Sequence, residues 1–246
     1  MNSITKFENL NDPYIVVGNR MYSIANQDGE FPRLGWHVEG EMAGVWAHPI
    51  KLFNEYGICV YKENEKINIK AKSFNIEPTK ANTKFLGDKI EITKSEFVPD
   101  DLEALVIDYS IKAICDFNYK IEFKAVANVI GTWTAEDAGF KNGTDEVFEN
   151  NNKNKVVFKD SINPWFAGIY AKDDASVDIS EDELLSAKFS YNLELKKDEV
   201  KTLRFIIVGS SVSYEQFETT LNNITNNLES LIEAKENRYE EIRKKI

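Results

Sequence analysis

Apolar and polar residues alternate along most of the chain between Tyr14 and Gly209. Successive side chains of a strand point to opposite faces, so this alternation indicates strands with one buried face and one wet face. The most regular segments are 69–78, 89–98, 102–114, 119–130, 155–160, 166–172, 188–197 and 200–209. Turn signals such as Gly87-Asp88 separate several of them. The pattern predicts a mainly β fold in which two large antiparallel sheets pack face to face.

The apolar period changes after residue 211. Apolar residues then recur at steps of four and three, at Phe217, Leu221, Ile224, Leu228 and Leu231. This spacing predicts a long amphipathic C-terminal α-helix, with Ser213 as N-cap and Gln216 completing a capping box. At about 1.5 Å per residue the helix would be roughly 50 Å long. No glycine, asparagine or proline closes it before Ile246, so we expect the helix to lead into a further domain.

Two segments interrupt the alternation. Residues 131–154 are polar and contain glycine, with Trp133 near their start, and they predict a long surface excursion. Residues 26–50 are the second interruption. They hold an unusual concentration of ring and charge chemistry, which is considered below.

Composition excludes several classes of partner. The net charge is −11 and 29% of the 246 residues are charged, which argues against binding to nucleic acid or to an anionic membrane. No apolar run reaches the roughly 18 residues of a membrane span, and the first residues lack the apolar core of a signal peptide. We therefore expect a cytoplasmic protein. Cys59 and Cys115 lie in apolar runs and are expected to be buried, while a disulfide between them stays open. No motif indicates a metal or a cofactor.

The segment 35–51 holds both histidines, two of the four tryptophans and two close carboxylates. Its candidate site residues are Trp36, His37, Glu39, Glu41, Trp46 and His48. On a strand, Glu39 and Glu41 would lie on one face about 6.5–7 Å apart. Such a pair cannot easily flank a sugar from opposite sides, which disfavours glycosidase catalysis by these residues.

Two other interpretations of this segment stay open. Tryptophan faces, imidazoles, carboxylates and the Lys51 ammonium suit a carbohydrate or a protein partner. Alternatively, Trp36 and Trp46 close one end of the sandwich as core residues. A metal site that combines His37 or His48 with a carboxylate fits no known spacing.

The run NRMYSIANQDGEFPRLGWHVEGEMAGVWAHPIKLFNEYGI resembles the start of bacterial six-hairpin glycosidases, which are similar to glycogen-debranching enzymes, glucosidases or trehalases. The tail LESLIEAKENRYEEIRKKI resembles their linker segment. The resemblance implies an N-terminal β supersandwich over residues 1–210 and a linker helix over residues 211–246. It also implies an (α/α)6 catalytic barrel that would follow this chain and would carry the catalytic acid and base.

We therefore expect a non-catalytic N-terminal domain of a glycoside hydrolase that acts on α-glucosidic oligosaccharides. It would support the barrel and shape its substrate cleft. Expected partners are carbohydrate, the protein's own catalytic domain, and a second copy through the C-terminal helix. Two alternatives are a free-standing carbohydrate-binding module, with Trp36 and Trp46 or Trp133 and Trp165 as its platform, and a mutarotase-like sugar isomerase.

Overall fold

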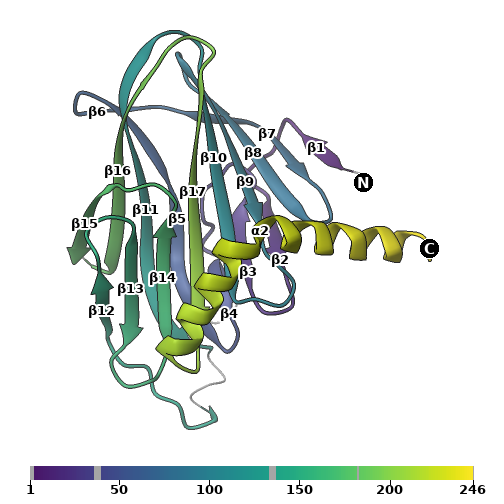
Figure 1. Cartoon of the computed structure of the whole chain (residues 1–246), viewed down its shortest axis with the longest axis vertical. Coiled ribbons are helices and arrows are strands. Elements are labelled where there is room, and N and C mark those ends of the chain that lie inside the picture. Colours follow the sequence, from purple (N-terminus) through teal and green to yellow (C-terminus); the bar gives the residue numbers. More distant parts are fainter. Residues whose placement is uncertain (1–2, 36–39, 133–136, 182, 246) are drawn as a thin grey trace.

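The computed structural model describes residues 3–35, 40–132, 137–181 and 183–245. These residues form two antiparallel sheets that pack face to face, followed by one long helix (Figure 1). This arrangement confirms the predicted fold class. Strand β17 (Val200–Ser210), which contains the expected segment 200–209, departs from simple alternation because both of its faces are buried, one by the opposite sheet and one by the helix.

Sheet A has nine strands, and its middle strands carry most of the core. In spatial order they are β1 (Ile4–Lys6), β7 (Lys70–Ile76), β8 (Lys80–Leu86), β9 (Ile90–Phe97), β10 (Ala104–Ala113), β17 (Val200–Ser210), β14 (Phe166–Ala171), β13 (Lys155–Asp160) and β12 (Asp145–Asn150).

Sheet B has eight strands, and one of them, β6 (Glu65–Ile67), pairs only with β5. The other seven, in spatial order, are β15 (Ser176–Glu181), β16 (Leu185–Leu195), β11 (Phe117–Gly131), β5 (Ile50–Lys62), β4 (Gly44–Ala47), β3 (Tyr22–Asn26) and β2 (Pro13–Val17).

Strand β12 corrects one expectation. Residues 131–154 were expected to form a surface excursion, but residues 145–150 pair with β13 as the last strand of sheet A. The alternation is weak there because β12 is an edge strand. Val147 and Phe148 are both substantially exposed, and a register shift between Val147 and Glu149 breaks the period.

The core between the sheets is rich in aromatic side chains. Phe123 of β11 stacks on Phe205 of β17, with ring centroids 3.9 Å apart, and so joins the two sheets at their centres. Cys59 and Cys115 are half-buried free thiols, so they do not pair with each other.

Helix α2 (Tyr214–Arg243) lies with its first half on the outer face of sheet A. Its buried residues Phe217, Leu221, Ile224 and Leu228 contact Val106, Ile206 and Val208 of the sheet. Gly168 permits this contact, because a Cβ atom there would lie 2.4 Å from the Phe217 ring. The predicted cap is confirmed, since the Ser213 hydroxyl accepts a hydrogen bond from the Gln216 amide at 3.1 Å.

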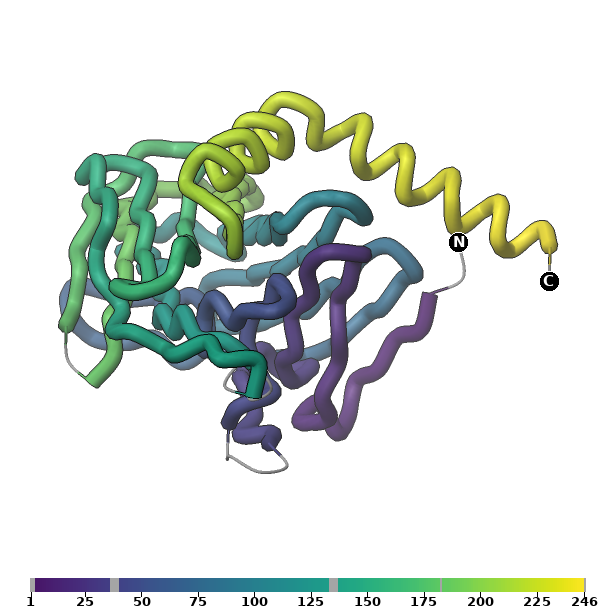
Figure 2. Tube along the Cα trace, turned by 90° about the horizontal axis from the view of Figure 1, so that it is seen from below, coloured from purple at the N-terminus to yellow at the C-terminus, as the bar shows by residue number. Residues whose placement is uncertain are grey.

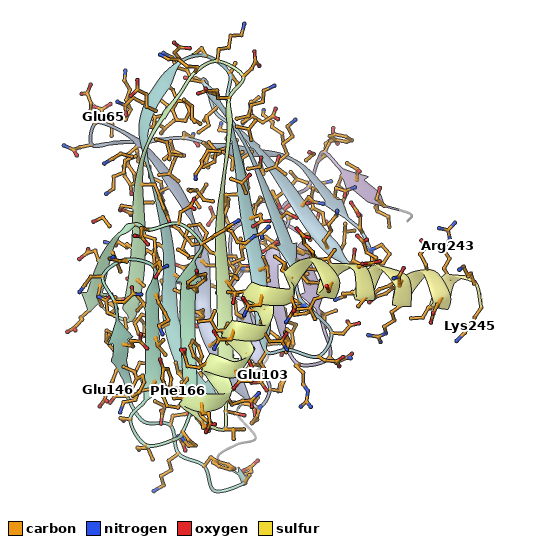
Figure 3. The ribbon with its side chains drawn as sticks, viewed as in Figure 1. Glu65, Glu103, Glu146, Phe166, Arg243 and Lys245 are labelled. Carbon is orange, nitrogen blue, oxygen red and sulfur yellow. The ribbon has the colours of Figure 1, made fainter. Side chains whose placement is uncertain are left out.

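The second half of α2 runs past the sheets after a kink at Asn227, whose backbone is not helical (Figure 2). Its buried Lys235 donates hydrogen bonds of 2.6 Å to two carbonyl oxygens, those of Val17 in sheet B and Val98 beside sheet A. The charged residues Arg243 and Lys245 lie at the far end of the helix (Figure 3). Among the described residues, no helix has the length and apolarity needed to span a membrane.

The apolar stripe of α2 is therefore largely covered by the chain's own sheet as far as Ile232. Tyr239 is half-buried, and Ile242 is exposed.

Candidate functional site

Trp46 of the predicted segment is a core residue on β4. Its side chain is 4% exposed, its ring lies parallel to Tyr22 at 6.5 Å, and its indole N–H donates to the Met42 carbonyl at 3.1 Å. Trp165 is buried as well. Neither ring presents a face to solvent, so among the described residues these tryptophans form no exposed platform.

His48 lies exposed at the turn between β4 and β5, just before a cis bond to Pro49. Its Nε2 atom is 2.8 Å from the Tyr22 hydroxyl, and its ring lies against Trp46 with centroids 5.7 Å apart. Trp36, His37 and Glu39 lie outside the described residues. Of the six predicted site residues, Glu41, Trp46 and His48 can therefore be placed.

Lys51 holds the segment in place from the start of β5. It is only 1% exposed, and its ammonium donates to the carbonyl oxygens of Gly40 at 3.2 Å and Glu41 at 3.3 Å. It also lies 5.5 Å from the centre of the Trp46 ring, within the range of a cation–π contact. Burial lowers the pKa of Lys51 to about 8, and the nearby Glu41 carboxylate partly opposes this shift.

A hollow of about 570 Å³ lies between this segment and the strands β5 and β11, and we call it the outer hollow. Its polar lining includes Glu41, Lys51, Asn54, Asn128 and Asn142. The Asn128 amide donates to the Asn54 side-chain oxygen at 2.8 Å, and the Asn142 side-chain oxygen accepts from the Gly131 amide at 2.8 Å. Amides held in this way offer donors and acceptors in fixed directions, which suits a polyhydroxylated ligand.

A buried polar cluster lies between the sheets, and the sequence analysis did not identify it. Its members are Tyr14, Tyr56, Lys94, Glu96 and Tyr109. Glu96 is 0% exposed and accepts hydrogen bonds from the hydroxyls of Tyr14 and Tyr56. The Lys94 ammonium lies 3.2 Å from Glu96 and donates to the Tyr14 hydroxyl at 3.2 Å.

The three tyrosines of this cluster keep their protons at neutral pH. Burial raises the pKa of each hydroxyl well above its usual value, and the Glu96 carboxylate adds to the effect. Because the Tyr56 hydroxyl donates to Glu96, its 3.2 Å contact with Ser23 is one in which the serine donates. The cluster thus contains one ion pair surrounded by neutral hydroxyls.

The cluster forms the floor of a second hollow of about 580 Å³, which we call the inner hollow. Lys94, Tyr56 and Tyr109 line its floor, and Phe31 and Phe85 are among its walls. It adjoins the outer hollow, since Phe31 and Glu55 line both. The two hollows therefore lie next to each other beside β5.

The β9 sequence carries a signal that could have located this cluster. In Ile90–Phe97, alternate positions are buried, namely Ile90, Ile92, Lys94 and Glu96, and the last residue, Phe97, is buried as well. The alternation that places the two isoleucines in the core also places Lys94 and Glu96 there. A lysine and a glutamate on the buried face of a strand indicate a paired internal site.

No protein-family model and no curated protein matches this chain. Solved structures do match its fold. A protein assigned as a kojibiose phosphorylase from the human microbiome is 11% identical with a TM-score of 0.68, over 97% of this chain and 37% of that one. An α-galactosidase of family GH36 from Geobacillus stearothermophilus is 8% identical with a TM-score of 0.52, over 85% of this chain and 42% of that one.

A galactose mutarotase related enzyme from Lactobacillus acidophilus is 10% identical with a TM-score of 0.53, over 82% of this chain and 99% of that one. At such identities the comparisons establish the fold. The chain has the β-sandwich fold that occurs in glycosidases and in mutarotase-like proteins, as the resemblance of its N-terminal segment implied. It spans well under half the length of the phosphorylase-like protein and of the α-galactosidase.

Proposed function

We propose that this chain is a carbohydrate-binding, non-catalytic sandwich domain of a glycoside-hydrolase-type protein, and that it holds an α-glucosidic oligosaccharide in the outer hollow. The observation that carries the proposal is the set of oriented amides and the Lys51 ammonium around that hollow. Their combination with a fold shared by proteins of sugar metabolism supports it.

In this proposal, the sugar hydroxyls donate to Glu41 and to the amide oxygens, and they accept from the amides of Asn54 and Asn128. Trp46 and His48 position the segment: Trp46 packs beneath it, and His48 orients Tyr22 at the turn. Trp36, His37 and Glu39 remain proposed sugar contacts from the sequence.

The proposal includes a division of the protein. Residues 1–210 form the sugar-facing domain, and residues 211–246 form the helix that leads to a catalytic barrel, where bond cleavage takes place. The match to 37% of the phosphorylase-like chain supports this division. A cytoplasmic location and self-association through α2 remain part of the proposal.

Calorimetry of the full chain with glucose, maltose and maltotriose tests the proposal. Maltotriose should bind, and Asn128→Ala should weaken its binding roughly threefold to tenfold, as the loss of one or two hydrogen bonds predicts. Asn118→Ala is the matched control, because Asn118 is exposed on the same strand but lies outside both hollows. Absence of binding heat with all three sugars would overturn the proposal.

A second candidate function is sugar isomerisation. It is favoured by the match to 99% of the length of the mutarotase-related enzyme, and it would use a histidine and a glutamate as acid and base, with the exposed His48 as the histidine. Polarimetry of fresh α-glucose tests it. Anomer interconversion should exceed that in buffer and fall in His48→Ala; a rate equal to that in buffer would exclude this candidate.

A further inference from the structure

The inner hollow has polar groups at its floor. The Tyr109 side chain lines this floor and is 2% exposed, and its hydroxyl takes no part in the hydrogen bonds that join Tyr14, Tyr56, Lys94 and Glu96. Lys94, also 2% exposed, donates a hydrogen bond to the Tyr14 hydroxyl and forms an ion pair with Glu96, whereas an ammonium group has three N–H donors. A hydroxyl and an ammonium group that line the same hollow can both donate to an oxygen atom, so this floor is suited to receive an oxygen atom from a ligand.

The walls of the inner hollow are apolar and are held in position. Phe31, Ile58, Ile67 and Phe85 are half-buried around it. Gly29 has a φ of +92°, and a Cβ atom there would lie 2.8 Å from the Phe85 ring, so the glycine lets its turn pack directly against this wall. Aromatic faces beside a few convergent polar groups are typical of sites for ring-shaped ligands that carry hydroxyls.

The hollow opens where sheet B is split beside β5. On one edge of β5, pairing with β4 reaches Phe53 and pairing with β6 begins at Val60. In the described structure, residues 55–59 therefore pair only with β11. The side chains at this opening carry both signs of charge, with Asp28, Glu30 and Glu55 opposite in sign to Lys66 and Lys124. Such a balance favours a neutral polar ligand over an anion or a cation.

We propose that the inner hollow is a second sugar subsite, in which the terminal ring of an oligosaccharide hydrogen-bonds to Tyr109 and Lys94 while the next rings lie in the outer hollow. Phe31 and Glu55, which line both hollows, mark the junction between the two subsites. This inference rests on the proposed function. It adds that the protein binds the oligosaccharide by its terminal ring, and not only along an open face.

Calorimetric titration of the full chain with glucose and maltotriose tests the second subsite. Tyr109→Phe removes one hydroxyl and keeps the ring, and it should raise the Kd of both sugars roughly threefold to tenfold. Tyr119→Phe is the matched control, since Tyr119 is a buried tyrosine that lines neither hollow. It should leave both Kd values unchanged.

A blocking variant keeps the test decisive if Tyr109→Phe does not fold. A Cβ atom at Gly57 meets no atom within 4 Å, so Gly57→Leu places its side chain in open space beside the hollow. This variant should bind maltotriose at least tenfold more weakly than wild type.

The two proposals fail differently. If the wild type binds neither sugar, the proposed function is refuted. If the wild type binds maltotriose and Asn128→Ala weakens that binding, while Tyr109→Phe and Gly57→Leu match the wild type, then the inner subsite is refuted and the proposed function stands.

Discussion

The ion pair of Lys94 and Glu96 provides the most direct test of the buried polar cluster. Replacing Glu96 by glutamine keeps the shape of the side chain but removes the counter-charge of an ammonium group that is 2% exposed. Breaking a buried pair by removing one partner costs about 3–5 kcal/mol, because the other charge stays in a medium of low polarity. We therefore expect Glu96→Gln to lose about 3–5 kcal/mol of stability.

The double variant should recover most of this loss. With Lys94→Met added, no buried charge is left, and the remaining cost should be about 1–2 kcal/mol for the disturbed tyrosine hydrogen bonds. Lys94→Met alone should be milder than Glu96→Gln, because the hydroxyls of Tyr14 and Tyr56 still donate to the carboxylate. The cycle therefore predicts a coupling energy of about 2 kcal/mol or more.

Urea unfolding of the four proteins measures these values, and thermal melting should show a fall of about 6–20 °C for Glu96→Gln. Glu91→Gln is the control on the same strand. Glu91 faces outward and pairs with the exposed Lys84 at 2.9 Å, so its loss should cost no more than about 1 kcal/mol. If Glu96→Gln were as mild as Glu91→Gln, or if the double variant were simply additive, the cluster would not contain a coupled buried ion pair.

Three further predictions concern the frame around the hollows. Because burial lowers the folded-state pKa of Lys51 to about 8 from its usual 10.5, the folded chain binds fewer protons between these values, so stability should rise with pH across this window; the rise in urea midpoint should vanish in Lys51→Met. Gly44→Ala should lower the free energy of unfolding by about 2 kcal/mol or more, since φ is +101° and a Cβ atom would lie 2.2 Å from a carbonyl oxygen of β5. Gly40 also has a positive φ but has open space around it, so Gly40→Ala should lower the melting temperature less. Lys235→Met should speed amide hydrogen exchange in the second half of α2 but not in the first, and equal rates in variant and wild type would contradict the anchoring role of this lysine.

The strands were predictable because one physical rule governs most of them. Where one face is buried and one is wet, alternation locates the strand, as in 119–130 within β11. The rule weakens where both faces are buried, as in the run Phe205–Val208, and where neither face is, as in β12. The kink at Asn227 was not predictable, since the apolar spacing continues through it.

The site was only partly predictable from the sequence. The segment 35–51 was singled out for its rings and charges, and its Glu41 and Lys51 do line a hollow. The local sequence could not show that Trp46 points into the core, because that depends on its pairing with Tyr22 on β3. The buried cluster joins residues from four strands. The sequence signals it only through the alternation in β9, which places Lys94 and Glu96 on the buried face.

The Lys235 ammonium ties one helical turn to both sheets at the same point. One of its acceptors belongs to β2, the last strand of sheet B, and the other follows β9 of sheet A. The direction of the projecting half of α2 is therefore coupled to the closure of the sandwich at this edge. A force that swings the helix would act on both layers together, and a ligand that shifts one layer against the other would redirect the helix.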